Sequence, residues 1–179
     1  MEIKNYESLN RFQIVNLLEG NINIGIELGV AEGSFSIKMM ESKKFSKFYG
    51  VDSYEVFPHD EKEFLSTKQK LSKYKNYKLI KGNFKNILNN FPDNYFDFIY
   101  IDGFAHTGNE SGQTLKNWFK KVKVGGIVSG DDYHSDWPII KETIFEFCKK
   151  FNFQLCITNI YDTDIYSQYP SWFFLKLKK

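Results

Sequence analysis

The sequence predicts an α/β fold built on one doubly wound, mostly parallel sheet of seven strands that ends in an antiparallel hairpin. Short apolar runs alternate five times with helix-like segments, which is the pattern of such sheets. The run Phe96–Ile101 (FDFIYI) is almost wholly apolar, as in a parallel strand covered by helices on both faces. The last two apolar runs have only a turn-rich connection between them, which indicates a hairpin.

The first half of the chain is expected to hold three of the strands, each a short apolar run bounded by glycine or polar residues. A helix comes first, because Phe12, Val15 and Leu18 recur at helical spacing. In chain order the expected elements are helix Tyr6–Leu18, strand Ile22–Leu28, helix Ser34–Met40, strand Phe48–Val51, helix Asp60–Tyr74, strand Tyr77–Ile80 and helix Lys85–Asn90.

The second half begins with the FDFIYI strand and contains the clearest amphipathic helix, with Pro138 near its first turn. In order the expected elements are strand Phe96–Ile101, helix Glu110–Lys121, strand Ile127–Ser129, helix Trp137–Phe151, and strands Phe153–Ile160 and Trp172–Leu177. At 179 residues, with no repeat or linker, the chain is expected to be a single domain, residues 1–179.

Composition excludes several classes of function. The 24 basic and 22 acidic residues nearly cancel, and only Arg11 among the basic residues is an arginine, so we expect no nucleic-acid partner. No signal peptide and no apolar run of membrane-spanning length is visible, so we expect a cytoplasmic protein without a membrane partner. Cys148 and Cys156 fit no metal or disulfide spacing and are expected to be buried thiols.

Ligands of open parallel sheets bind beyond the carboxyl ends of the strands, so the residues that follow each strand are the candidate site. After the first strand, Gly29, Ala31 and Gly33 are small enough to let the backbone approach a ligand, and Glu27 precedes them. The spacing differs from the dinucleotide fingerprint, because position 34 is serine and the glycine falls at 33. It suits a nucleoside cofactor without a pyrophosphate better.

The next two strands offer contacts for such a nucleoside. Asp52, followed by Ser53, ends the second strand, where a carboxylate can accept both ribose hydroxyls; a turn or helix cap is the alternative. Asn83 and Phe84 follow the third strand and could meet the edge and the face of an adenine ring. An ordinary helix start explains these two residues equally well.

Carboxylates follow the fourth and fifth strands. Asp102 ends one and Asp131 and Asp132 end the other, so adjacent strand ends should gather all three. Three converging carboxylates repel one another unless a positive charge lies between them, and Mg²⁺ or another divalent cation is the expected occupant. Such a metal could activate an acceptor hydroxyl, with His106 as general base and His134 as the alternative. Helix capping by the aspartates is the competing interpretation.

Together these residues resemble the class I S-adenosylmethionine-dependent methyltransferases, and within them the macrocin and mycinamicin sugar O-methyltransferases. The matching segments are IELGVAEGSFS (Ile26–Ser36), YGVDSY (Tyr49–Tyr54), FDFIYIDGFAH (Phe96–His106) and VKVGGIVSGDDYH (Val122–His134). The resemblance implies a Rossmann-like fold whose usual last hairpin fits the final two strands.

The resemblance also implies roles. Glu27, Gly29, Ala31 and Gly33 would form the loop around the methionine and ribose, Asp52 would hold the ribose hydroxyls, and Asn83 or Phe84 would touch adenine. In the metal-dependent sugar enzymes magnesium is held by residues that correspond to Asp102, Asp131 and Asp132, and a histidine in an Asp-Gly-x-His segment is the base. Here His106 follows one residue later, and Asn83 stands where an acid is usual.

We therefore predict an S-adenosylmethionine-dependent O-methyltransferase that acts on a hydroxyl of a small molecule, with a sugar as one acceptor class and a divalent metal as assistant. A binding protein that kept the fold without catalysis is the alternative, as is a methyltransferase with another class of acceptor. A nucleic-acid methyltransferase and a nicotinamide oxidoreductase are disfavoured. Assembly into a homo-oligomer stays open.

Overall fold

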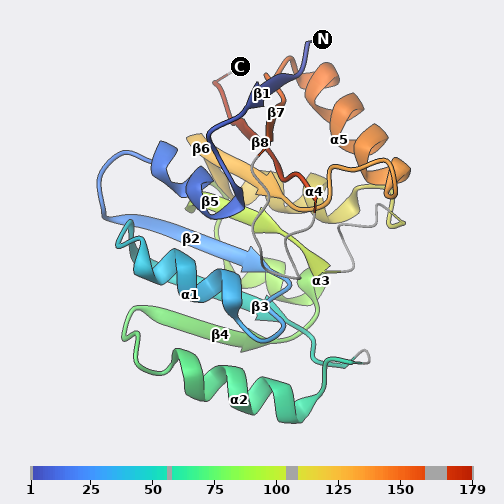
Figure 1. Cartoon of the computed structure of the whole chain (residues 1–179). Coiled ribbons are helices and arrows are strands. Elements are labelled where there is room, and N and C mark those ends of the chain that lie inside the picture. The colour runs from blue at the N-terminus through green and yellow to red at the C-terminus, as the bar shows by residue number, and fades with distance from the viewer. Residues whose placement is uncertain (1, 56–57, 104–108, 160–168, 179) are drawn as a thin grey trace.

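The computed structural model describes residues 2–55, 58–103, 109–159 and 169–178 (Figure 1). These residues form one eight-stranded sheet in the order β1-β7-β8-β6-β5-β2-β3-β4. The strands are β1 (Lys4–Tyr6), β2 (Asn23–Leu28), β3 (Phe45–Asp52), β4 (Tyr77–Lys81), β5 (Phe96–Ile101), β6 (Val122–Gly130), β7 (Cys156–Thr158) and β8 (Trp172–Leu175).

Helices connect most of these strands. The α-helices are α1 (Ser34–Glu41), α2 (Glu61–Leu71), α3 (Phe84–Ile87), α4 (Gln113–Trp118) and α5 (Pro138–Phe151), and the 3-10 helices are η1 (Arg11–Leu17), η2 (Leu88–Asn90) and η4 (Phe119–Lys121). No helix in the described part of the chain combines the length and apolar character that a membrane span needs.

The predicted fold class is confirmed. Only β8 runs against its neighbours, pairing antiparallel with β6 and β7, while the other pairs of neighbouring strands are parallel. The strand ends of the prediction shift by a few residues. The largest change is in β6, which begins at Val122 rather than Ile127 because its first half pairs with β5 at Phe96.

The beginning of the chain differs from the prediction, which placed a helix over Tyr6–Leu18. Residues 4–6 instead form β1, an eighth strand that pairs with β7 at the edge of the sheet (Figure 1). The helical part starts only at Arg11, where Asn10 and Gln13 form a reciprocal capping box. Periodicity could not reveal β1, because its pairing partner lies about 150 residues further along the chain.

The core has two layers, one on each face of the sheet. Along β5, Phe98 and Tyr100 pack on the face covered by η1 and α1, and Ile99 and Ile101 pack on the opposite face. The opposite face is covered by α4 and α5, which bury Leu115 and Ile144. This two-sided burial is why the FDFIYI strand is apolar without alternation.

The order of strands places a switch point at the centre of the sheet. From β2 the chain builds outward through β3 to β4, then returns to the other side of β2 and builds outward through β5 and β6. The backbone N–H of Gly29 bonds to Val51 and that of Asp102 bonds to Leu28, so the loops leaving these strands begin side by side. Ligands of such sheets bind at this edge.

Candidate functional site

A cavity of about 1030 Å³ opens at the carboxyl ends of the strands. Ten of the predicted site residues line it: Glu27, Gly29, Ala31, Asp52, Ser53, Asn83, Phe84, Asp102, Asp131 and Asp132. Gly33 lies behind the loop instead, where an added Cβ would meet Thr67 and Leu71 of α2 at 3.0 Å. His106 lies outside the described residues. The volume is at the upper end of the roughly 300–1,000 Å³ of small-molecule pockets, which leaves room for a cofactor and a second molecule.

Gly29 is held in a conformation that requires glycine. Its φ is +94°, and a Cβ at this position would lie 2.6 Å from the backbone nitrogen of Gly103 and 2.8 Å from the carbonyl carbon of Asp102. The loops after β2 and β5 therefore touch through backbone atoms alone. This contact places the loop that follows β2 next to Asp102 in the lining of the cavity.

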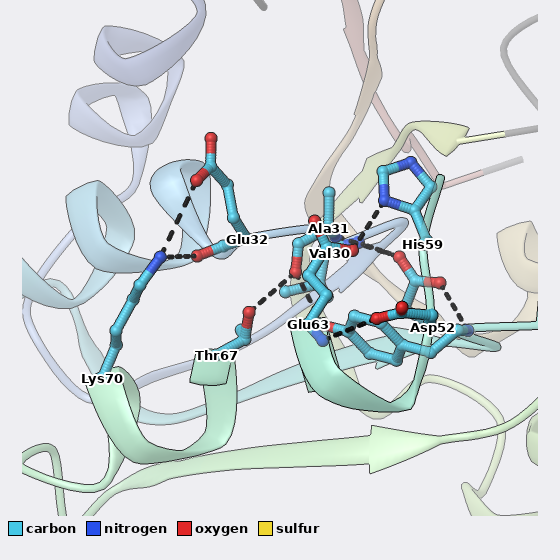
Figure 2. A network of polar contacts seen from close by, with 10 residues as sticks. Val30, Ala31, Glu32, Asp52, His59, Glu63, Thr67 and Lys70 are labelled. Carbon is cyan, nitrogen blue, oxygen red and sulfur yellow. Dashed lines mark hydrogen bonds and ion pairs between the residues drawn. The ribbon is translucent and has the colours of Figure 1, made fainter. Parts of the chain in front are cut away.

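The rest of this loop is fixed by hydrogen bonds from outside it. The carbonyl of Ala31 accepts from the hydroxyl of Tyr54 at 2.7 Å and from that of Thr67 at 3.0 Å. Lys70, on the same helix as Thr67, reaches Glu32 (Figure 2). Because Ala31 has a φ of +46°, these bonds stabilise a backbone conformation that alanine rarely adopts.

Asp52 is both a loop anchor and a cavity residue. Its Oδ2 accepts the backbone N–H groups of Val30 at 2.8 Å and Ala31 at 3.0 Å, and its Oδ1 accepts that of Tyr54 at 3.1 Å (Figure 2). A carboxylate has about four acceptor sites, and donors among the described residues use three of them, which leaves one for a ligand hydroxyl rather than the two that both ribose hydroxyls would use. The two interpretations of Asp52, as a turn residue and as a cavity residue, are thus compatible.

Glu27 is a buried carboxyl group at the base of the cavity, only 1% exposed. Its Oε2 accepts from the hydroxyl of Ser36, which in turn contacts the hydroxyl of Tyr77 at 2.9 Å. Burial raises the pKa of Glu27 well above its usual value, and nearby Asp102 adds to that shift, while Ser36 opposes it. The neutral acid is favoured here more than in water.

Asn83 and Phe84 begin α3 beside the cavity. The side chain of Asn83 accepts the backbone N–H of Lys85 at 2.9 Å, so it caps the helix. The ring of Phe84 lies close to Gly103, whose added Cβ would be 3.7 Å from it. Phe84 therefore offers an apolar surface next to the backbone contact between the two loops.

The three predicted carboxylates do gather at one end of the cavity, and a cation lies with them. Asp102, Asp131 and Asp132 all line it, and Asp102 and Asp132 both act on the charge of Asp131. The cation is the guanidinium of Arg11, whose Nη1 lies 2.7 Å from Oδ2 of Asp131. Both side chains are about 95% buried, so this is an internal ion pair.

The predicted metal site is not confirmed. The second oxygen of Asp131 accepts from the hydroxyl of Ser171 at 3.0 Å, so both oxygens of this carboxylate already have protein donors. Oδ1 of Asp102 accepts the backbone N–H of Gly103. In the ranges that the structure describes, no three His, Cys, Asp or Glu side chains form a group that could hold a metal ion. The arrangement of Asp131 does not fit a metal ligand.

The electrostatics of this pair follow from its burial. Burial alone would lower the pKa of Arg11, but the charges of Tyr100, Asp131, Asp102 and Glu27 outweigh it and raise that pKa. Burial and Asp102 raise the pKa of Asp131 to about 7, with Arg11 opposing. The guanidinium therefore stays charged, and its charge opposes the protonation of Asp131 that burial favours.

Two histidines in the described part of the chain, His59 and His134, have different surroundings. His134, the alternative base, stacks on Tyr169 with ring centroids 4.4 Å apart and lies 3.3 Å from Asp136. His59 lines the cavity, and its Nδ1 is 2.7 Å from Oε2 of Glu63 (Figure 2). Sequence reasoning missed the position of His59, although the spacing of His59 and Glu63, four residues apart at a helix start, could have shown it.

The sequence analysis did not predict another part of the cavity lining. This part consists of polar residues of α4 and the segment before it, namely Glu110, Gln113, Thr114 and Asn117. Nε2 of Gln113 donates to Oδ1 of Asn117 at 3.0 Å, and both oxygens of Glu110 accept from Thr114. Their recurrence at positions 110, 113, 114 and 117 gives one polar helical face, which is the signal that could have shown them.

The fold and this cavity define the class: a Rossmann-like domain with a nucleoside-sized site at its switch point. A family model described as "Methyltransferase domain" matches residues 26–133, which span β2 to the residues after β6. The chain belongs to this family, and it is an S-adenosylmethionine-dependent methyltransferase. A comparison with curated protein sequences finds no match.

Solved structures resemble the whole chain. A putative caffeoyl-CoA O-methyltransferase from Staphylococcus aureus matches with a TM-score of 0.68 at 18% identity, covering 92% of this chain and 80% of its own. The N-methyltransferase NodS from Bradyrhizobium japonicum gives 0.66 at 13%, covering 94% and 93%. A precorrin-6y C5,15-methyltransferase from Geobacter metallireducens gives 0.64 at 13%, covering 98% and 94%. At these identities the likeness establishes the fold, and the narrower sugar O-methyltransferase resemblance stays a prediction.

Proposed function

We propose that this methyltransferase transfers the methyl group of S-adenosylmethionine to a hydroxyl oxygen of a small molecule, with a sugar hydroxyl as the narrower acceptor. The observation that carries the proposal is that the lining of one cavity contains two chemically different sets of residues, which we call its two halves. One half is the glycine loop with Asp52 and Phe84, and the other is the polar face of α4 with the Asp131 end of β6.

The first half suits the cofactor. The free acceptor site of Asp52 can receive a ribose hydroxyl, and the close approach at Gly29 leaves backbone exposed to the methionine part. Phe84 offers its ring to adenine, and Ser53 lies beside Asp52 on the same wall. Asn83 serves this half by capping α3 and so fixing Phe84.

The second half supports a hydroxylated acceptor. Amide and hydroxyl groups of Gln113, Asn117, Thr114 and Tyr169 line it, and such groups can donate to and accept from several hydroxyls of one molecule. A sugar presents many hydroxyls to such a wall.

The chemistry requires positioning and removal of one proton. When bound, S-adenosylmethionine supplies an electrophilic methyl group on sulfur. The chain's residues orient both molecules so that the acceptor oxygen faces that methyl, which lowers the entropic part of the barrier. The hydroxyl proton needs a base, and His106 remains the predicted one. Because Asp131 is occupied by Arg11 and Ser171, we assign no step to a metal.

The proposal is tested by calorimetric titration of S-adenosylmethionine and its demethylated product into the wild type, Asp52→Asn and Asp97→Asn. Asp97 is a matched control, because it also accepts a backbone N–H, from Ile24 at 2.8 Å, but lies at the other end of the sheet. We expect Asp52→Asn to weaken binding by about tenfold or more, since hydrogen bonds to a charged group contribute about 1.5–3 kcal/mol. Asp97→Asn should leave affinity unchanged.

The acceptor is then sought by mass spectrometry with a panel of sugars, phenols and amines. Methyl transfer to hydroxyl oxygens supports the proposal, with sugars preferred in its narrower form. Transfer to nitrogen or carbon overturns the acceptor assignment. Absence of cofactor binding by the wild type overturns the whole proposal, and binding without transfer to any acceptor favours the non-catalytic alternative.

A further inference from the structure

The only arginine of the sequence is buried in the candidate site. Arg11 is 4% exposed, and its guanidinium lies over the rings of Phe12, Phe35 and Tyr100 at 5.2, 5.3 and 5.7 Å. It reaches Asp131 across 120 residues of sequence, from the 3-10 helix that precedes β2 to the end of β6. Burying a charge costs several kcal/mol unless it is well paired, so such an arrangement needs a reason.

The charges around Arg11 provide that reason. Asp131, Asp102 and Glu27 are carboxyl groups near enough to act on its charge, and all three line the cavity with it. Without a cation, ionised Asp131 and Asp102 would repel each other in a poorly solvated place. Sequence reasoning expected a divalent ion here, whereas the structure places a side chain.

Arginine suits this position better than lysine, although all 23 other basic residues of the chain are lysines. A guanidinium is planar, stacks on aromatic rings and stays charged when buried, whereas a buried lysine readily loses its proton. The three surrounding rings hold its plane, and Asp131 fixes its edge. Its position is thus set as firmly as that of a bound ion.

We propose that Arg11 is the built-in cation of this site, a positioning residue that takes the place of a divalent metal and holds the Asp131 carboxylate in position at the end of β6. The inference concerns the same site as the proposed function and deepens it: methyl transfer should need no added metal. Its test does not use the cofactor or the acceptor, so the two proposals can fail separately.

The test is a titration with Mn²⁺ in mildly alkaline buffer, with bound and free Mn²⁺ measured by electron paramagnetic resonance. The wild type should bind no Mn²⁺ at this site, because the guanidinium of Arg11 already pairs with Oδ2 of Asp131. Arg11→Met removes this partner and its charge, and we expect a measurable gain in Mn²⁺ affinity. The double variant Arg11→Met/Asp131→Asn should lose that gain, since it removes a carboxylate as well.

Lys123→Met is the matched control, because Lys123 pairs with Asp97 at 2.9 Å at the opposite end of the sheet. Loss of that cation should create no Mn²⁺ binding. Arg11→Lys keeps a cation and should bind less Mn²⁺ than Arg11→Met. If Arg11 only filled space, the two variants would bind Mn²⁺ equally. Circular dichroism confirms that each variant folds.

Two results overturn the proposal. One is Mn²⁺ binding by the wild type that Asp131→Asn abolishes, because the resident cation is then a metal. The other is a folded Arg11→Met that gains no Mn²⁺, because the carboxylates then need no cation. If Arg11→Met does not fold, the wild-type titration alone decides: no binding supports the proposal and binding lost in Asp131→Asn refutes it.

Discussion

Gly29→Ala tests whether the backbone contact between the loops after β2 and β5 builds the cofactor half of the cavity. A methyl group at this position would lie 2.6 Å from the nitrogen of Gly103 and 2.8 Å from the carbonyl carbon of Asp102. Ordinary contacts between such atoms are about 3.5–4.0 Å, so the two loops must separate. Neither neighbour is a flexible side chain that could turn away.

The cost has two parts, and Gly125→Ala separates them. Gly125 has a φ of +85°, similar to the +94° of Gly29, but an added Cβ meets nothing within 4 Å. An L residue in this region costs about 1–2 kcal/mol, and both variants carry that cost. Forced overpacking adds about 1–3 kcal/mol at Gly29 only. We expect losses of roughly 1–2 kcal/mol for Gly125→Ala and about 2–5 kcal/mol for Gly29→Ala, from the sum of these terms.

Urea unfolding and calorimetric titration of S-adenosylmethionine measure the two consequences. The excess loss in Gly29→Ala, about 1–3 kcal/mol, corresponds in a thermal melt to a melting temperature lower by about 2–12 °C than that of Gly125→Ala, at about 2–4 °C per kcal/mol for a chain of this size. Cofactor affinity should fall in Gly29→Ala and stay at the wild-type value in Gly125→Ala. Equal stability of the two variants, with equal cofactor affinity, would refute the assigned contact.

Thr67→Val keeps the shape of a fully buried side chain but removes the hydroxyl that donates to Ala31. We expect about 1 kcal/mol lower stability in urea and several-fold weaker cofactor binding, whereas the exposed Ser72→Ala should change neither. Glu27→Gln tests the raised pKa of the buried Glu27 carboxyl. Such a group contributes stability that is fully present below pH 4.5, its usual pKa, and that is lost as the pH rises. Wild-type stability relative to Glu27→Gln should therefore decline with rising pH in denaturant titrations; a constant difference would mean that burial does not shift this group.

Local pattern was sufficient for the central part of the fold. Phe96–Ile101 has the predicted limits because a strand buried on both faces must be apolar throughout, and no tertiary contact changes that. α5 begins at Pro138, one residue after the predicted start, because proline suits a first helical turn. At the edge of the sheet, the local sequence pattern did not predict β1, because this strand is three residues long and forms only by pairing with β7.

The candidate site, too, could be predicted from the sequence only in part. Its carboxylates and glycines could be found from the sequence, because parallel strands all deliver their last residues to one edge of the sheet. Their roles were harder to predict. Asn83 is a helix cap, and Asp131 is paired, because hydrogen-bond partners are set by distances that sequence spacing does not give.

What the sequence by itself determined is the order of strands and helices after β1, the two-sided core and the gathering of Glu27, Asp52, Asp102 and Asp131 at one cavity. What only the tertiary structure decided is which group balances those charges. Three carboxylates call for a cation, but electrostatics does not distinguish a metal from a guanidinium. The choice depends on where Arg11 falls when η1 packs over α1, and that long-range contact has no signature in local sequence.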